Sequence, residues 1–494
     1  MSHEPALHET TSLCRVCKNA LPATVFERDG AVFMSKRCPQ HGAQEVQLSD
    51  DAGWYTKTRA IEPIRSPPHV IKKDLKHGCP FDCGPCASHE QKVRLPVVTI
   101  TSACNLDCPI CYVHNKNDDA FHMKEADFER VVEHLIRDHG GELDILNLTG
   151  GEPTLHPRLI DFLEKAKAAG VHRITICSNG IRLVKDEALV KRLAALGARI
   201  ALSFDTFDRA ADVLLQGAEL FDLKMRCLDI LQAHDIDTTL IPVMSRGVND
   251  HEIGRIIDVL LSRPNVRHLE VHTMTFTGQS GATFDRGVRI SMHEVLRRIE
   301  ETTNGLLTVA DFVPSPCAHP LCYSITYLLM DPDGGPPVPF LRFPTRDELY
   351  SALSDRLYLE PTRALEDAFR SAIDRLFTDD APDSERILGL LRRLLDTMFP
   401  AGQSLTREAS LRISERAIKA IYVHSHMDEE TFDVERAYLC CDSNAYPDGS
   451  TIPVCNYNVL YREKEASFVH EPKRWNERAG GKRTFLPILA RGAS

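Results

Sequence analysis

Three closely spaced cysteines constrain this chain more than any other feature. Residues 101–112 read TSACNLDCPICY, which places Cys104, Cys108 and Cys111 in a CxxxCxxC spacing directly after the apolar, β-branched run VVTI. Such a run predicts a strand, and the loop that leaves it can wrap three thiolates around one iron–sulfur cubane. Full ligation of a four-iron cluster takes four cysteines, so one iron stays open to another ligand. A zinc knuckle is the alternative, although zinc sites prefer paired CxxC motifs.

Composition and charge narrow the class of protein. The 494 residues suffice for two or three domains, and an apolar fraction of 43% is ordinary for a globular chain. A formal charge of −11, with no long basic run, argues against a nucleic-acid partner. The first residues, MSHEPALHETTSLC, contain no apolar signal segment, and no apolar run is long enough to cross a bilayer. We therefore expect a cytoplasmic protein without a transmembrane segment, which would meet a lipid substrate at the membrane surface or on a carrier.

The sixteen cysteines indicate metal sites, because nothing in the sequence points to an oxidising compartment. Residues 1–60 predict a small module in which a CxxC knuckle, a hairpin around Asp29-Gly30 and the run CPQH supply the ligands Cys14, Cys17, Cys38 and His41. The spacing fits a zinc ribbon or a single iron, and it slightly favours zinc because His41 departs from the all-cysteine ligation of a rubredoxin. The core is too small to fold unaided, so the metal is expected to fold it.

A second group of cysteines lies in residues 61–96. Cys79, Cys83 and Cys86 repeat the CxxxCxxC spacing, but no strand of the VVTI type precedes them, so we interpret them as ligands of an auxiliary cluster. Five more occur late in the chain: Cys317, Cys322, Cys440, Cys441 and Cys455. These eight cysteines are the number that two further four-iron clusters require. Which late cysteine joins the early loop stays open. The two remaining cysteines, Cys177 and Cys227, have the apolar context of core residues.

Residues 97–305 alternate apolar strand-like runs with amphipathic stretches, which predicts an α/β fold with a parallel sheet of βα units. Six units make a partial barrel. The expected strands are Val97 to Ser102, Asp144 to Leu148, His172 to Ser178, Arg199 to Phe204, Thr238 to Met244 and Arg267 to His272. In such folds the chemistry lies where the strands end at their carboxyl termini.

Polar residues and glycines follow several of these strands. They are Gly150, Gly151 and Glu152 after the second strand, Ser178 and Asn179 after the third, Ser203 and Asp205 after the fourth, and Arg246 after the fifth. The two glycines allow the backbone to approach a ligand closely. Arg246 fits either a carboxylate partner in the site or a surface charge. In the sixth strand His268, Glu270 and His272 alternate and so share one face, which is either internally paired or turned toward substrate.

Residues 306–465 hold the late cysteines, and we expect them to form an auxiliary-cluster domain. A charged helical insertion occupies about 345–420, either as a cover or as part of a substrate channel, and residues 466–494 form a tail.

The order of motifs along the chain resembles the radical S-adenosylmethionine superfamily. CxxC with CPxHG, HGCPxDCGxC, CNLxCPxCY, GGEPT, PCxxPxC, and CC with PDGxxIPxCxYN together resemble the family of tetraether lipid synthase and the class D radical methylases. The resemblance runs from Leu13 to about Arg462. It implies a [4Fe-4S] cluster on Cys104, Cys108 and Cys111 with S-adenosylmethionine on the open iron, two auxiliary [4Fe-4S] clusters, and a rubredoxin-like site that shifts the expected metal of the N-terminal module to iron.

The resemblance also implies roles for site residues. Tyr112 completes the cysteine motif, the Gly150-Gly151-Glu152 segment would meet the amino group of S-adenosylmethionine, and Ser178, Asn179, Ser203 and Asp205 would contact its ribose and carboxylate.

The implied reaction is hydrogen abstraction from an unactivated carbon by a 5'-deoxyadenosyl radical. We expect it to form a carbon–carbon bond between lipid chains, as in a tetraether synthase, through a long apolar channel. The alternative is radical methylation of a pterin-like small molecule in a pocket with several hydrogen-bonding groups. Both need an electron donor such as a ferredoxin or flavodoxin. A third reading, a multi-cluster electron-transfer protein, would have no use for the GGEPT motif.

Overall fold

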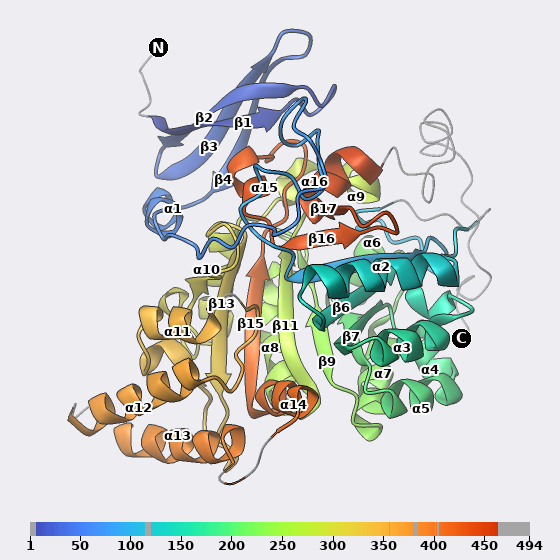
Figure 1. Cartoon of the computed structure of the whole chain (residues 1–494). Coiled ribbons are helices and arrows are strands. Elements are labelled where there is room, and N and C mark those ends of the chain that lie inside the picture. Colours follow the sequence, from blue (N-terminus) through green and yellow to red (C-terminus); the bar gives the residue numbers. More distant parts are fainter. Residues whose placement is uncertain are drawn as a thin grey trace.

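The structure is a computed structural model that describes residues 6–113, 120–354, 356–378, 383–400, 402 and 405–462. The predicted tail at 466–494 lies outside the described residues. A small sheet sits above a long central sheet, and helices flank the long sheet on either side (Figure 1).

The N-terminal module is a four-stranded antiparallel ribbon. Its strands are β1 (Ala6–Leu13), β2 (Ala20–Arg28), β3 (Ala31–Cys38) and β4 (Gly42–Ser49), followed by helix α1 (Ala52–Arg59). Asp29 and Gly30 both have positive φ in the turn between β2 and β3, which suits the twist of a tight two-residue hairpin. Val25, Val32 and Met34 pack beneath α1 and form the small core of the module.

The predicted partial barrel is confirmed. Six parallel strands run in the order β5 (Leu95–Thr101), β6 (Leu143–Gly150), β7 (Val171–Ser178), β8 (Arg199–Ser203), β9 (Thr238–Ile241) and β11 (Val266–Thr273). The expected fifth strand is interrupted at Pro242, which has no N–H for the ladder, and the short β10 (Val243–Met244) pairs only with β11.

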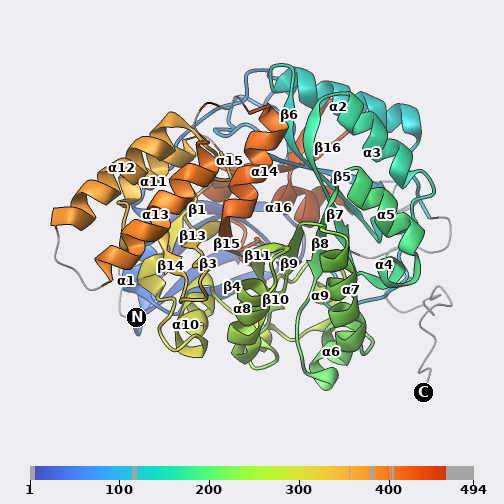
Figure 2. The same cartoon turned by 90° about the horizontal axis from the view of Figure 1, so that it is seen from below.

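Helices cover the outer face of this barrel, as the view from below shows (Figure 2). They are α2 (Glu125–Asp138), α3 (Leu159–Ala168), α4 (Ile181–Lys185), α5 (Glu187–Ala195), α6 (Arg209–Gln216), α7 (Phe221–Ala233) and α8 (Ile253–Ser262). Helix α2 buries the face that its sequence predicts, with Phe128, Val131, Val132 and Leu135 in the core.

Strands from the C-terminal third extend the same sheet at both ends. At one end β15 (Ile418–His424) pairs parallel with β11, and β13 (Tyr323–Leu329) pairs antiparallel with β15. At the other end β16 (Asp442–Ala445) pairs parallel with β5 and leads to β17 (Thr451–Pro453). The short β12 (Val313–Pro314) and β14 (Val338–Pro339) pair with β13. The expected boundary at residue 305 is therefore not a boundary in the sheet.

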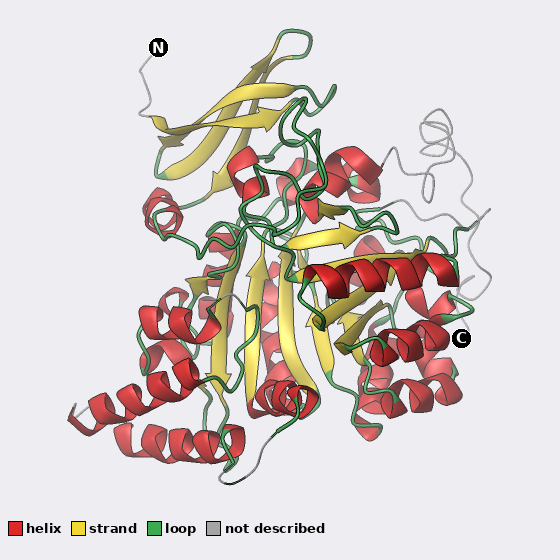
Figure 3. Cartoon of the chain, in the orientation of Figure 1, coloured by secondary structure: helices red, strands yellow, loops and turns green. Residues whose placement is uncertain are grey.

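Helices occupy the predicted insertion (Figure 3). They are α11 (Arg346–Leu353), α12 (Arg363–Thr378), α13 (Ser384–Met398) and α14 (Arg407–Ala417). Tyr327 of β13 and Phe340 pack with Phe369 of α12 and Leu391 of α13 in a second core, separate from that of the barrel. The other helices near the barrel are α9 (Gly278–Thr283), α10 (Met292–Thr302), α15 (Val434–Tyr438) and α16 (Val454–Asn456). No helix among the described residues has both the length and the apolar character to cross a membrane.

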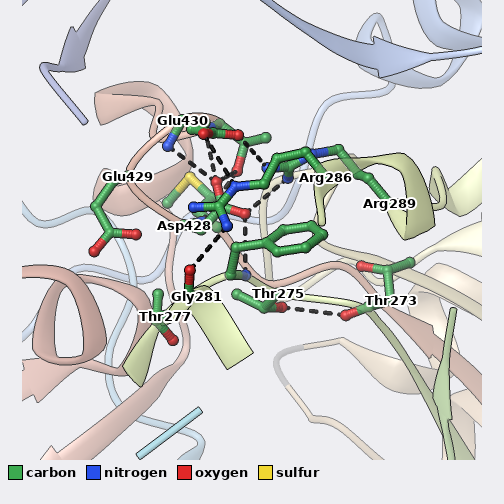
Figure 4. Close-up of polar contacts among 12 residues, drawn as sticks. Thr273, Thr275, Thr277, Gly281, Arg286, Arg289, Asp428, Glu429 and Glu430 are labelled. Carbon is green, nitrogen blue, oxygen red and sulfur yellow. Dashed lines mark hydrogen bonds and ion pairs between the residues drawn. The ribbon is translucent and has the colours of Figure 1, made fainter. Parts of the chain in front are cut away.

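An acidic loop, Asp428–Glu430, joins the ribbon to the barrel. On the barrel side, Arg289 places its Nη1 atom 2.7 Å from Asp428 and its Nη2 atom 2.7 Å from Glu430, and Arg286 also pairs with Glu430 (Figure 4). On the ribbon side, the buried Lys36 donates to the backbone carbonyls of Glu429 and Glu430 at 3.2 and 2.7 Å. The loop is thus held between cations of both parts.

Candidate active site

The three cysteines of the CxxxCxxC motif line a cavity of about 280 Å³ inside the barrel. Their loop is internally bonded: Cys111 N donates to Cys108 O at 3.0 Å, and Leu106 N donates to Cys104 Sγ at 3.4 Å. Burial raises the pKa of the Cys104 and Cys108 thiols, and the Cys111 thiol raises both further. Buried thiols ionise readily only beside a compensating cation, which iron supplies. The donor set therefore fits an iron–sulfur cluster.

The glycines of the GGE motif position the cysteine loop. A Cβ atom on Gly150 would lie 2.0 Å from Thr101 O, and one on Gly151 would lie 2.2 Å from Ala103 O. Gly151 N and Glu152 N also donate to these two carbonyls, at 2.8 and 2.7 Å. The close approach that the glycines allow is thus an approach to the cysteine loop, which is fixed on the end of β6.

Glu152 connects the second and third strand ends. Its carboxylate accepts hydrogen bonds from Ser178 Oγ at 3.0 Å, Asn179 N at 2.7 Å and Thr154 Oγ1 at 2.6 Å. Burial raises the pKa of Glu152, and these donors oppose the rise. Asn179 Nδ2 in turn donates to Asn105 of the cysteine loop at 2.7 Å. The structure thus brings Glu152, Ser178 and Asn179 together, and all three line the cavity.

Ser203 and Asp205 line the same cavity from the end of β8. Burial raises the pKa of Asp205 to about 6, although its carboxylate accepts hydrogen bonds from Val243 N at 2.8 Å and from Gln216. Lys224 Nζ donates to the carbonyl and hydroxyl of Ser203 at 2.6 and 2.9 Å. Gln216 and Lys224 were missed from the sequence, where the only sign of them is a polar residue on the inward side of an amphipathic helix.

Tyr112 and Arg246 end in different places. Tyr112 lines the cavity, and the guanidinium of Arg462 lies 4.9 Å from the centroid of its ring. Arg462, at the far end of the described chain, was not predicted. Arg246 Nη2 lies 2.6 Å from Glu294 of α10, and Arg246 lines a different cavity, of about 330 Å³, between the barrel and the ribbon. The structure does not bring Arg246 to the cysteines.

Polar residues of three other strands form a further part of the cavity lining, here called the polar wall. Glu270 and His272 of β11, His424 of β15 and Asp442 of β16 all line the cavity. Tyr323 donates its hydroxyl to Asp442, whose pKa burial raises to about 6. Of the three alternating residues predicted in the sixth strand, Glu270 and His272 face the cavity.

His268 lies apart from this wall. Its ring stacks on Tyr358 with a centroid distance of 5.2 Å, and burial lowers its pKa to about 4.

The four predicted ligands of the ribbon converge. His41 Nδ1 lies 3.5 Å from Cys14 Sγ and 3.4 Å from Cys38 Sγ, and the Sγ atoms of Cys17 and Cys38 are 3.8 Å apart. Tetrahedral zinc, with Zn–S near 2.3 Å and Zn–N near 2.0 Å, separates its ligands by about 3.5 Å. Burial opposes ionisation of Cys14, but hydrogen bonds, including one from Gln44, lower its pKa to about 6. The set fits one mononuclear metal ion.

The other cysteines fall into neighbourhoods. Burial, followed by Cys83 and Cys86, raises the pKa of Cys79, so the early loop forms one group. Burial raises the pKa of Cys440, and the nearby Asp442, Cys455 and Cys322 raise it further. Burial also raises the pKa of Cys441, with further increases from Asp442, Cys440 and Cys317. These effects place Cys322 and Cys455 near Cys440, and Cys317 near Cys441, with Cys440 and Cys441 adjacent in the chain.

Comparisons with known proteins agree with this geometry. Residues 98–260 match the radical SAM superfamily, and residues 6–50 match the HMPTM N-terminal zinc ribbon domain. The chain is 28% identical to the 7,8-dihydro-6-hydroxymethylpterin dimethyltransferase of Methanocaldococcus jannaschii, across 94% of this chain and 96% of that protein. It is 30% identical to the GTP 3',8-cyclase of Chlorobaculum tepidum, but only across 33% of this chain and 48% of that protein.

Among solved structures, Streptococcus suis SuiB bound to S-adenosylmethionine is similar with 17% identity and a TM-score of 0.35, covering 43% of this chain and 48% of that chain. The superfamily match spans strands β5 to β9, whose ends carry the cysteine, GGE and Ser178-Asn179 segments. These segments line one buried cavity. The chain is therefore an enzyme of the radical S-adenosylmethionine superfamily, with a zinc-ribbon fold at its N-terminus.

Proposed function

We propose that this enzyme is a radical methyltransferase that acts on a pterin-like heterocycle. The observation that carries the proposal is the set of carboxylate and amide side chains in the cavity lining. Glu270, Asp442, Asn147 and Asn444 all line this cavity, and they offer carboxylate and amide groups at the barrel centre. A pterin presents ring N–H, amino and carbonyl groups that match such a lining.

These side chains disfavour a lipid chain. Methylene groups beside the Glu270 and Asp442 carboxylates would exclude water and leave them only the hydrogen bonds that His272 and Tyr323 supply, which is less favourable than contact with a polar substrate. The helical insertion would have to supply a channel for a long chain, yet none of its described residues lines the cavity. The similarity to a protein named as a pterin dimethyltransferase, along nearly the whole chain, supports the same substrate class. We therefore favour methylation over coupling of two lipid chains.

The chain's own residues divide the work of the site. Cys104, Cys108 and Cys111 would hold a [4Fe-4S] cluster, which supplies the electron for reductive cleavage of S-adenosylmethionine. Glu152 and Asp205 end their strands beside the cysteine loop, where they would orient the amino and hydroxyl groups of that cofactor. Glu270 and Asp442, which also line the cavity, would hold the heterocycle.

The remaining metal sites are part of the proposal. We assign zinc to the ribbon, since the matching domain is a zinc ribbon and the ligand separations suit a tetrahedral ion. This choice replaces the iron that the resemblance had favoured. The early group of Cys79, Cys83 and Cys86 and the five late cysteines would hold two auxiliary [4Fe-4S] clusters. A ferredoxin or flavodoxin would deliver electrons.

The test is anaerobic turnover of the reconstituted enzyme with methyl-deuterated S-adenosylmethionine and a reductant, offered a pterin pool and a lipid extract in parallel. We expect the mass of a pterin to increase by the mass of one or two methyl groups. Either deuterated or unlabelled methyl groups would meet this expectation. The Glu270→Gln variant should form much less methylated product but still form 5'-deoxyadenosine, because the change removes a proposed substrate contact in the cavity. The exposed Glu142→Gln is the matched control. Joined lipid chains, with no methylated pterin, would refute the proposal.

A further inference from the structure

Three histidines converge where strands β11 and β15 end. His272, His424 and His426 each place one ring nitrogen within 4.8 Å of the nitrogens of the other two. The ring centroids of His424 and His426 are 3.8 Å apart, and that of His272 lies 5.4 and 4.9 Å from them. Only the zinc-ribbon ligands and a third group, in which Glu435 already pairs with Arg59, meet the same criterion among the described residues.

We propose that His272, His424 and His426 form a second mononuclear metal site, for a transition-metal ion of the zinc or ferrous type, that opens into the active-site cavity. All three residues line that cavity. The site is distinct from the cysteine clusters and from the ribbon, because its three protein ligands are all imidazoles.

The sheet topology explains why the three side chains meet. β11 and β15 are adjacent parallel strands in which His272 is the register partner of His424, so the two imidazoles lie side by side at the carboxyl ends. His426 follows two residues later. Parallel strands from distant parts of the sequence thus deliver three nitrogen donors to one point, at the edge of the sheet where α/β enzymes bind their ligands.

The state of the imidazoles suits a metal. His424 is 5% exposed, and its Nδ1 atom has no hydrogen-bond partner among the described residues, the Glu270 carboxylate being 3.7 Å away. A buried ring nitrogen without a partner is costly, and a metal ion would remove that cost.

Two carboxylates lie beside these rings. Glu270 Oε1 lies 3.1 Å from His272 Nε2, and Asp442 Oδ2 lies 3.9 Å from His424 Nε2. Histidines that bind metals commonly have such outer partners, which fix the ring and strengthen its donor nitrogen. The two carboxylates also balance the charge of a divalent cation that would otherwise be buried in the barrel.

The donor set selects the type of metal. Imidazole nitrogens suit zinc and iron, whereas magnesium and calcium require oxygen ligands. Three protein ligands leave a fourth tetrahedral position free, as in catalytic rather than structural zinc sites. That position would face the cavity and take a nitrogen or oxygen atom of a bound substrate. The substrate contact rests on the proposed function, whereas the metal site does not.

The test uses zinc as the probe, because iron is abundant elsewhere in the protein. The full-length chain is reconstituted anaerobically with iron and sulfide, equilibrated with excess zinc, desalted, and measured by metal analysis and zinc-edge X-ray absorption. We expect two zinc ions per chain in the wild type and one in His272→Ala and His424→Ala. The ion that is lost should have nitrogen or oxygen neighbours at about 2.0–2.1 Å. His272→Cys should keep two ions and gain one sulfur neighbour, and His172→Ala on β7 should match the wild type.

Three results would overturn the proposal. The first is a wild type that binds only one zinc, with the three-sulfur shell of the ribbon. The second is unchanged zinc in both alanine variants. The third is a second zinc bound mainly by sulfur, since His426 Nδ1 lies 3.7 Å from Cys455 Sγ and could instead pair with a cysteine site. The iron content shows whether the alanine variants have folded. If they have not, the zinc-edge spectrum of the wild type alone tests the proposal. The zinc measurement needs no turnover, so its outcome does not depend on whether the methyltransferase proposal is correct.

Discussion

Gly151 shows how one residue without a side chain sets the position of the cluster loop. Its backbone N–H bonds to Thr101 O, and its Cα faces Ala103 O so closely that no methyl group fits between them. Strand β5 ends two residues before Ala103 and strand β6 ends just before Gly151, so the sheet restrains the backbone on both sides of this contact. The position of the three cysteines therefore depends on Gly151, although the hydrogen bonds described for Gly151 involve none of their thiols.

Gly151→Ala should displace the cysteine loop. A Cβ atom 2.2 Å from Ala103 O forces the loop away from β6, so we expect the protein to lose most of its reductive cleavage of S-adenosylmethionine and about one cluster's worth of iron. Quantification of 5'-deoxyadenosine and of iron per chain checks this. Gly389→Ala on α13 is the control, because nothing lies within 4 Å of its added Cβ. Equal cleavage in both variants would contradict the packing argument.

Lys419 gives the molecule a pH-dependent stability. Burial lowers its pKa to about 7, and its ammonium donates to the carbonyls of Leu260, Arg263 and Val266. Above pH 7 the Lys419 amine is mostly deprotonated in the folded state, whereas in the unfolded state it stays protonated until the pH approaches the ordinary pKa of lysine. The free energy of unfolding therefore rises with pH, by at most about 1.4 kcal/mol per pH unit. We expect the pH dependence of the thermal midpoint between pH 7 and 9 to be more positive in the wild type than in Lys419→Met. Parallel curves would exclude this role.

The acidic loop Asp428–Glu430 contains a buried carboxylate whose charge one arginine balances. Asp428 is 1% exposed, and although burial raises its pKa, Arg289 lowers it to about 2. Arg289→Ala would leave that charge buried without its partner, which typically costs about 3–5 kcal/mol. We expect a clear fall in the thermal midpoint. Arg297→Ala removes an exposed pair with Glu301 on α10 and should change little. Similar midpoints for the two variants would contradict this account.

The elements differ in how well the sequence predicts them. The six barrel strands are short runs in which apolar residues are successive or alternate, so they could be found locally. β15 is also apolar, but its partner β11 lies about 150 residues earlier, across the helical insertion, and no local pattern reveals that pairing. The polar wall was missed in part for this reason, since His424 and Asp442 reach the cavity only because β15 and β16 join the two ends of the sheet.

Single site residues follow the same rule. The cysteines were found because metal spacing is local in sequence, and Glu152, Ser178 and Asn179 because strand ends meet at one edge. Lys224 was missed because its burial depends on the tertiary fold, and Arg246 is absent from the cavity because Glu294, on a later helix, pairs with it.

At the scale of the whole molecule, the N-terminal ribbon is a small part docked on the barrel. Its own core is small, and it contacts the barrel through Lys36, which holds the acidic loop, and through Asp50, which accepts a hydrogen bond from Ser291 and pairs with His293. We expect Cys14→Ser/Cys17→Ser to lose the ribbon metal and to become sensitive to proteolysis within about the first 60 residues, because such modules depend on metal to fold. Limited proteolysis with mass spectrometry of the fragments checks this. Cys227→Ser, at a buried cysteine outside the metal groups, controls for loss of a thiol. A protease-resistant ribbon without metal would show that docking alone folds it.

The stretch from His424 to Glu430 has a consequence for how the enzyme matures. Within these seven residues the chain passes from two cavity histidines, through Met427, whose N–H donates to Cys455 Sγ at 3.3 Å, to the loop that Lys36 of the ribbon holds. On the proposed function, loading of the ribbon metal, insertion of the auxiliary clusters and shaping of the substrate pocket would therefore converge on one short segment. Cofactor assembly should accordingly be ordered, and a chain that has not loaded its first ion should present an unfinished catalytic chamber.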